Sequence, residues 1–174
     1  MAHVRWALLI SFALLAAIAA GCDAGGDGGP SPATGPARAA TVVRVVDGDT
    51  LVARVDGADE RVRLLGVDAP ESVTPERPVE CFGPQAAGEA RRLMPRGARI
   101  SLAEDPSQGK RDRFDRLLAE VTVAGGTTTV NEELVAGGFA EVFRGDGRAR
   151  LLPSLRQAES AARAARRGLW GACR

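Results

Sequence analysis

Residues 41–65 read TVVRVVDGDTLVARVDGADERVRLL, in which three runs of β-branched and aliphatic residues alternate with turn sequences. The runs cover residues 41–46, 51–55 and 61–65. Both turns between them contain the pair Asp-Gly, which favours a tight reversal of the chain. Three short strands joined this closely predict a β-meander.

The rest of the chain predicts two further strands and about three helices. A proline-rich loop at residues 69–84 precedes the other expected elements, which are a helix over 85–94, strands over 99–103 and 116–123, a short helix over 132–136, and an amphipathic helix from Leu151 to near Gly168. We expect Asn131 to cap the short helix, because its side-chain oxygen can accept a hydrogen bond from the first turn. Five strands with helices between and after them predict a β-rich α+β domain, built as a single five-stranded barrel of the OB-fold type.

The N-terminal 40 residues differ in composition from the rest of the chain. Residues 1–21 carry Arg5 and then an apolar run that is too short to span a bilayer comfortably, which predicts a signal peptide. The segment ends in Ala-Ala-Gly-Cys, which resembles the lipobox of bacterial lipoproteins with Cys22 as the lipidated residue. An ordinary signal peptide with a chance cysteine is the alternative. Residues 22–40 are mostly Gly, Pro and Ala and predict a flexible linker, so that the folded domain covers residues 41–174.

These features predict an exported protein. With the lipid on Cys22 it is anchored to the cell membrane and faces outward; without the lipid it is secreted. We expect the protein to be a monomer.

Composition excludes several classes of chemistry. The single histidine, His3, lies in the predicted signal, so the mature chain cannot use a Ser-His-Asp triad, a Cys-His pair or a histidine-based metal site. The chain has 23 basic and 22 acidic residues, and removal of Arg5 with the signal leaves these charges balanced. Bulk charge therefore offers no attraction to nucleic acid, and any such binding must be local.

Three cysteines are present: Cys22, Cys81 and Cys173. If Cys22 is lipidated, the other two form an even pair in an oxidising compartment, which predicts one disulfide. The alternative is two free thiols, which are less usual in exported proteins.

Carboxylates and arginines are left to carry the chemistry. Asp49, Asp68 and Glu71 lie beside two loop-forming segments, and oxygen ligands of this kind suit Ca²⁺ or Mg²⁺. Arg63 and Arg116 offer forked donors for a phosphodiester and for the charge that develops on it in the transition state. Together these residues suffice for phosphodiester hydrolysis without histidine.

An ordered set of segments resembles the thermonuclease family, whose members have staphylococcal nuclease-like domains. The segments are VDGDT at 46–50, RLLGVDAPE at 63–71, DRFDRL at 112–117, VNEELV at 130–135 and GLW at 168–170. Each segment alone is weak evidence for the resemblance, since Asp-Gly-Asp, for example, is common in turns. The order and spacing of the whole set are specific to the family. The resemblance covers residues 41–170.

The resemblance implies a role for each candidate residue. Asp49 and Asp68 correspond to the carboxylates that bind Ca²⁺, together with the main-chain carbonyl of Ala69. Glu71 corresponds to the general base, and Arg63 and Arg116 correspond to the arginines that grip the phosphate. The loop residues Arg113 and Phe114 correspond to substrate-binding positions.

The implied activity is Ca²⁺-dependent hydrolysis of DNA and RNA, as an endonuclease that leaves 3′-phosphate and 5′-hydroxyl ends. The alternative is a non-catalytic OB-fold module that binds nucleic acid or protein at the cell surface. Such modules typically lack the carboxylates or arginines, whereas this chain keeps them.

Three features depart from the family pattern or require explanation. The chain has no tyrosine, so Phe114 replaces a hydroxyl-bearing ring, and Asp115 replaces a glycine beside Arg116, where it either pairs with that arginine or weakens phosphate binding. Strict alternation along a strand would also send Arg63 and Asp68 to opposite faces. They can share a site only if the chain bends between them, which Gly66 would permit.

Overall fold

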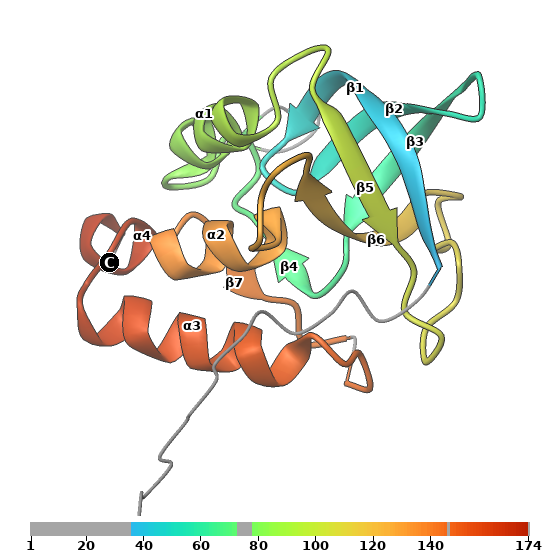
Figure 1. The fold of residues 1–174 in the computed structure, drawn as a ribbon. Helices are drawn as coiled ribbons and strands as arrows, with labels where there is room; N and C mark the ends of the chain where they lie inside the picture. The colour runs from blue at the N-terminus through green and yellow to red at the C-terminus, as the bar shows by residue number, and fades with distance from the viewer. Residues whose placement is uncertain (1–35, 73–77, 146, 174) are drawn as a thin grey trace, which may run out of the picture.

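The computed structural model describes residues 36–72, 78–145 and 147–173 (Figure 1). The predicted signal segment, Cys22 and most of the predicted linker lie outside the described residues. Within the described ranges, no helix has both the length and the apolar character needed to cross a membrane.

Five strands close into a barrel, which confirms the predicted OB-type architecture (Figure 1). They are β1 (Ala37–Asp47), β2 (Thr50–Val55), β3 (Ala58–Leu64), β5 (Arg99–Ala103) and β6 (Leu117–Val123). Around the barrel the order is β1-β2-β3-β6-β5. Neighbours are antiparallel except β3 and β6, which run parallel and pair Val62 with Leu117. The parallel contact places the start of β6 beside the end of β3.

Strand β1 begins earlier than the sequence predicts. Residues 37–40 were expected to be linker, but they pair with β5, Ala37 opposite Ala103 and Ala40 opposite Ile100. The segment Ala-Arg-Ala-Ala has low strand propensity, so its local sequence gives no signal. Pairing with a distant strand overrides that preference.

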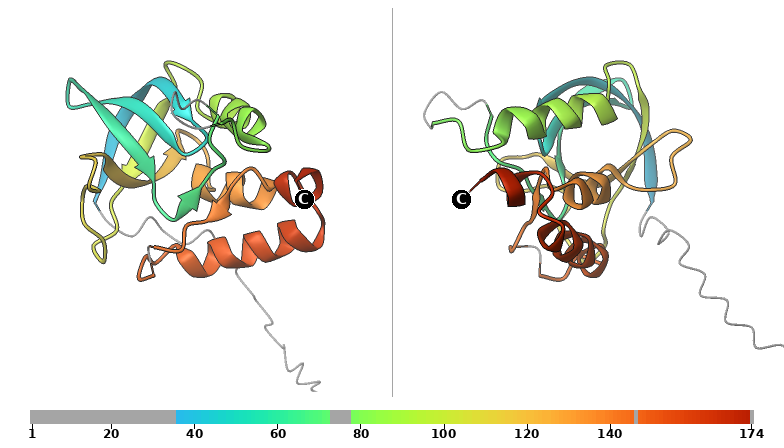
Figure 2. Two further views of the ribbon diagram at one scale, coloured as in Figure 1. Left: turned by 180° about the vertical axis from the view of Figure 1, so that it is seen from behind. Right: turned by 90° about the vertical axis from the view of Figure 1, so that its left-hand side faces the viewer.

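The helices lie beside one side of the barrel (Figures 1 and 2). They are α1 (Gly83–Leu93), α2 (Val130–Gly137), α3 (Leu152–Ala164) and α4 (Leu169–Ala172). The last helix was predicted to end near Gly168, but α3 ends at Ala164. After Gly168 the Leu169 N–H donates to the carbonyl of Gly138 at 2.9 Å, and the chain begins the separate helix α4.

A second, two-stranded sheet was not predicted. It pairs β4 (Val67–Asp68) with β7 (Glu141–Val142) in antiparallel register. Two residues are too short a run to show an alternating pattern in the sequence. This small sheet holds Asp68 just beyond the end of β3.

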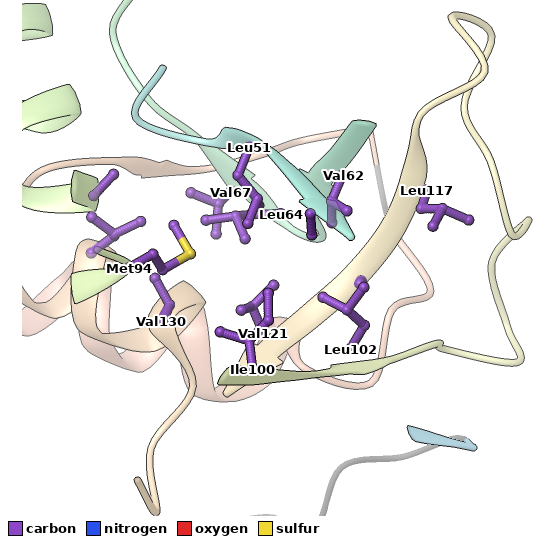
Figure 3. Packing of buried hydrophobic residues seen from close by; sticks show 14 of the residues in the cluster. Leu51, Val62, Leu64, Val67, Met94, Ile100, Leu102, Leu117, Val121 and Val130 are labelled. Atoms are coloured by element: carbon purple, nitrogen blue, oxygen red, sulfur yellow. The ribbon is translucent and has the colours of Figure 1, made fainter. Parts of the chain in front are cut away.

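The hydrophobic core fills the barrel and continues beneath the helices (Figure 3). Its members come from the barrel strands, from β4 and from the helical side of the molecule, and Figure 3 labels Leu51, Val62, Leu64, Val67, Met94, Ile100, Leu102, Leu117, Val121 and Val130. Met94 follows α1 and Val130 begins α2, so the helices and the barrel share one core.

The predicted cap of the second helix is wrong. Thr129 caps α2, with its Oγ1 accepting a hydrogen bond from the Glu132 N–H at 3.1 Å. Asn131 lies inside the helix, fully buried; its Oδ1 accepts from the Val121 N–H at 2.9 Å and its Nδ2 donates to the Leu65 carbonyl at 2.9 Å. These backbone groups would otherwise be buried without partners, so Asn131 joins α2 to the barrel.

Asp105 joins the loop that follows β5 to the backbone just before α3. Its carboxylate is buried and accepts hydrogen bonds from the backbone N–H groups of Arg150, at 2.7 Å, and Ser107, at 2.8 Å. Burial opposes ionisation, but these hydrogen bonds outweigh it and hold the pKa of Asp105 below its ordinary value of 3.8.

We expect Asp105→Asn to lower the free energy of unfolding by about 1–3 kcal/mol at pH 7, because an amide nitrogen would face a backbone N–H that needs an acceptor. The folded pKa is depressed, so the contribution of the carboxylate is full above pH 3.8 and is lost as the pH falls through the folded value. Urea unfolding of both proteins at pH 7 and at lower pH should show the difference shrinking in acid. Asp56→Asn, at an exposed carboxylate, is the matched control, and equal effects from the two substitutions would contradict the assignment.

Candidate active site

A pocket of about 970 Å³ opens on the barrel beside the end of β3. Its walls come from β1, the turn into β2, β3, β4, the loop before β6 and the segment after β7. The charged and aromatic residues that line it are Asp47, Asp49, Arg61, Arg63, Asp68, Glu71, Asp112, Arg113, Phe114, Arg116 and Phe143. All the predicted catalytic and substrate-binding side chains therefore border one cavity.

Asp49 is the buried carboxylate of this pocket, with 9% of the residue exposed. The Asp-Gly-Asp turn brings it to the start of β2. Its Oδ1 accepts from Thr50 Oγ1 at 2.8 Å, and its Oδ2 accepts from the Ala69 N–H at 3.0 Å. The second bond ties the β1–β2 turn to the segment after β4, so the chain at Ala69 is held beside the carboxylate.

Arg63 and Asp68 lie together although they are five residues apart. A guanidinium nitrogen of Arg63 is 3.2 Å from Asp68 Oδ1, and another is 3.2 Å from Asp49 Oδ2. The chain bends between the strands at Gly66, which has φ +73°. A side chain there would be strained, and its Cβ would lie 2.9 Å from Leu155. The bend that the sequence requires is therefore present.

The guanidinium of Arg63 also donates to the carbonyls of Leu64 and Val67, which close the same bend. These contacts fix the direction of its side chain, which is 12% exposed. The Arg63 guanidinium is therefore held at the wall of the pocket and does not extend into solvent.

The donor set at Asp49 and Asp68 fits a hard cation with water completing its shell. Two carboxylates and the carbonyl of Ala69 are oxygen donors of the type that Ca²⁺ prefers. Among the residues that the structure describes, no cluster of three or more acidic, histidine or cysteine side chains is placed to hold a metal.

Negative charge is crowded at this position. Burial raises the pKa of Asp68 above its ordinary value; Arg63 opposes the shift, while the charges of Asp49 and Glu80 add to it. A cation close to these groups would relieve their repulsion.

Arg116 also lines this pocket, and its guanidinium is held in place. Its Nε and a terminal nitrogen donate to Asp112 Oδ2 at 2.7 and 2.6 Å, and its other terminal nitrogen lies 3.3 Å from Thr50 Oγ1. Asp112 also accepts from the backbone N–H groups of Phe114 and Arg116, so it organises the whole loop. Burial opposes ionisation of Asp112, but these hydrogen bonds hold its pKa below the ordinary value.

Asp115 does not pair with Arg116. Its side chain is 87% exposed, and its carboxylate lies 3.5 Å from Arg111. The residue has a left-handed backbone conformation, with φ +61°. Of the two expectations for this residue, pairing with the neighbouring catalytic candidate is wrong.

Two exposed phenylalanines flank the arginines. The Phe114 ring lies 4.6 Å from the guanidinium carbon of Arg113 and 5.3 Å from that of Arg116. The Phe143 ring lies 5.9 Å from the guanidinium carbon of Arg63. Both are among the exposed large hydrophobic residues of the described ranges, which suits flat partners that stack on aromatic rings.

Glu71 lies on the segment between β4 and α1. Its main chain is joined to Glu80, since the Glu71 N–H donates to Glu80 Oε2 at 3.0 Å and the Glu80 N–H donates to the Glu71 carbonyl at 2.9 Å. On the other side, Ser72 Oγ donates to Asp47 Oδ1 at 2.6 Å. The sequence analysis assigned no role to Asp47, Glu80 or Asp112, because their partners are set by the fold. Asp47 and Asp112 do lie within the quoted segments at 46–50 and 112–117, which were the available signal.

Cys81 and Cys173 form a disulfide with their Cα atoms 6.0 Å apart. The bond joins the residue after Glu80 to the end of α4.

The fold and the pocket define an OB-fold barrel with arginines, aspartates and a glutamate around one solvent-accessible cavity. A sequence profile described as "Staphylococcal nuclease homologue" matches residues 61–172. The chain belongs to this family.

Three relatives show the range of similarity. The chain is similar to a protein named Thermonuclease from Staphylococcus hyicus, with 31% identity over 129 residues, 74% of this chain and 73% of that protein. It is 39% identical over 100 residues to Thermonuclease from Staphylococcus intermedius, covering 57% of this chain and 56% of the relative. It is 36% identical over 102 residues to Endonuclease YncB from Bacillus subtilis (strain 168), covering 59% and 46%. In the last two matches the chain spans about half of the relative.

Proposed function

We propose that this protein is a Ca²⁺-dependent nuclease that hydrolyses phosphodiester bonds in DNA and RNA and leaves 3′-phosphate and 5′-hydroxyl ends. The observation that carries the proposal is the convergence of Asp49, Asp68, Glu71, Arg63 and Arg116 on one pocket. Family membership and relatives named as nucleases support it.

Each residue has a role in this proposal. Asp49, Asp68 and the carbonyl of Ala69 would hold Ca²⁺, which supplies positive charge next to the phosphate. Arg63 and Arg116, which line the same pocket, bind the phosphate oxygens and stabilise the added negative charge as phosphorus becomes five-coordinate. Arg113 and Phe114 contact the neighbouring nucleotide, and the ring offers a stacking surface.

The bond changes follow from these roles. Glu71 accepts a proton from water as the water oxygen attacks phosphorus. The bond from phosphorus to the 5′ oxygen breaks, and that oxygen takes up a proton as it leaves as a 5′-hydroxyl. The phosphate remains on the 3′ side.

We also propose that the chain is exported, with residues 1–21 as the signal and Cys22 as a lipid anchor. The Ala-Ala-Gly-Cys sequence and the following Gly-Pro-Ala segment support an anchor with a tether. The Cys81–Cys173 disulfide supports an oxidising compartment.

The test of the proposed function is cleavage of single-stranded DNA and RNA by the purified protein with Ca²⁺ and then with a chelator. We expect cleavage to stop in the chelator and to return when Ca²⁺ is restored, and the product ends to resist ligation until the 3′-phosphate is removed and the 5′-hydroxyl is phosphorylated. A folded protein that binds DNA without cutting it under any of these conditions would contradict the proposal and favour the non-catalytic binding module.

A further inference from the structure

Glu71 and Glu80 lie side by side between β4 and α1. Two hydrogen bonds join these residues, one from the Glu71 N–H to Glu80 Oε2 at 3.0 Å and one from the Glu80 N–H to the Glu71 carbonyl at 2.9 Å. One of the two uses the Glu80 side chain, so the position of the Glu71 backbone depends on a carboxylate that is not among the lining residues of the large pocket.

The chain just after Glu80 is fixed in three ways. Cys81 is bonded covalently to Cys173. The Phe82 ring packs on Phe139, with centroids 5.6 Å apart. Gly83 approaches so closely that a Cβ there would lie 2.3 Å from the Glu71 carbonyl oxygen. The start of α1 and the end of α4 therefore hold Glu80 against Glu71.

We propose that Glu80 is a positioning residue for Glu71 and that the Cys81–Cys173 disulfide keeps Glu80 in place, so that the C-terminal end of the chain controls the alignment of the base. This inference rests on the proposed function, in which Glu71 accepts the proton from water. Alignment acts on the chemical step, and a small displacement of a catalytic group lowers turnover without removing the contacts that bind substrate.

Paired substitutions at Glu80 test the hydrogen bond. Glu80→Ala removes the acceptor, whereas Glu80→Gln keeps an acceptor oxygen and removes only the charge. We expect Glu80→Ala to lower kcat about 10- to 100-fold with KM nearly unchanged, and Glu80→Gln to restore most of the turnover. Equal impairment of the two variants, or normal kcat in Glu80→Ala, would overturn the inference.

The disulfide is tested by combining variants. Cys81→Ser/Cys173→Ser should lower kcat with KM little changed, measured where circular dichroism shows the variant folded. In the Glu80→Ala background the same double substitution should cause little further loss, because the bond acts through Glu80. Independent, multiplicative losses would overturn the proposed connection.

Hydrogen exchange at the Glu71 amide, followed by NMR without metal or substrate, separates this inference from the proposed function. Protection should fall in Glu80→Ala and in the disulfide variant and should persist in Glu80→Gln. If the wild-type protein cuts no nucleic acid, the proposed function fails, while the exchange data still decide whether Glu80 and the disulfide hold Glu71. If Glu71→Gln abolishes cutting but exchange and turnover are normal in Glu80→Ala, the proposed function stands and the positioning role is overturned.

Discussion

Glu71→Gln is expected to lower kcat by about two to four orders of magnitude, the range that a general base contributes. Glutamine has the same shape as glutamate but cannot accept a proton from water. The Glu71 backbone contacts with Glu80 do not involve its side chain, so the segment should keep its place. Affinity for a labelled oligonucleotide, measured by anisotropy, should therefore change by no more than about threefold.

Glu133→Gln, on the exposed face of α2, is the matched control for this substitution. It removes one carboxylate away from the pocket and should leave kcat unchanged. Turnover near the wild-type value in Glu71→Gln would exclude Glu71 as the base. A parallel loss of binding would instead indicate that the substitution disturbs the pocket.

Arg116→Ala is expected to lower kcat about 10²- to 10³-fold, the cost of removing one preorganised donor from a developing oxyanion. The structure holds this guanidinium in place before substrate arrives, through Asp112 and Thr50. Arg116→Lys should recover only part of the turnover, because an ammonium group lacks the planar fork. Single-turnover kinetics at saturating DNA measure the effect on the chemical step.

The control for Arg116 is Arg96→Ala, since Arg96 is exposed and does not line the pocket. It removes the same charge and tests whether any loss reflects general attraction to nucleic acid. Arg116→Ala also leaves Asp112 without its main ion-pair partner, so circular dichroism must show that the variant is folded. A folded Arg116→Ala protein with normal turnover would contradict the proposed phosphate contact.

The barrel could be predicted from sequence because its strands carry strong local signals. The β-branched runs and the Asp-Gly turns determine β2 and the end of β3 within one residue, and β5 has the predicted bounds. Strand β3 begins at Ala58, three residues before the predicted start. The first four residues of β1 could not be predicted, since an Ala-rich segment becomes a strand only when β5 lies beside it. The same holds for β4 and β7, whose pairing is purely tertiary.

The capping error at α2 has a different cause. Asn131 has the right chemistry for a helix cap, but so does Thr129 two residues earlier. The deciding factor is the need of the buried Val121 and Leu65 backbone groups for a partner. That need is visible only when the barrel and α2 are packed together.

The candidate site was predictable as a set of residues but not as a geometry. The motifs indicate Asp49, Arg63 and Asp68, and the alternation rule shows that the chain must bend at Gly66 for the last two to meet. The spacing of residues along the sequence does not show that Asp112 and Glu80 hold other residues of the site in place. Both act on backbone or side-chain groups whose positions depend on loops, where local sequence patterns are weakest.

The parallel pairing of β3 with β6 has a consequence for when this protein becomes active. Parallel contacts between distant parts of a chain form late, because loop closure must precede them. Arg63 comes from the first of these strands and Arg116 from the residue before the second, so a chain still emerging from the ribosome, or crossing a membrane unfolded, does not bring the two together. Under the proposed function, the unfolded chain cannot cleave the nucleic acid of the producing cell. Activity requires that the barrel has closed.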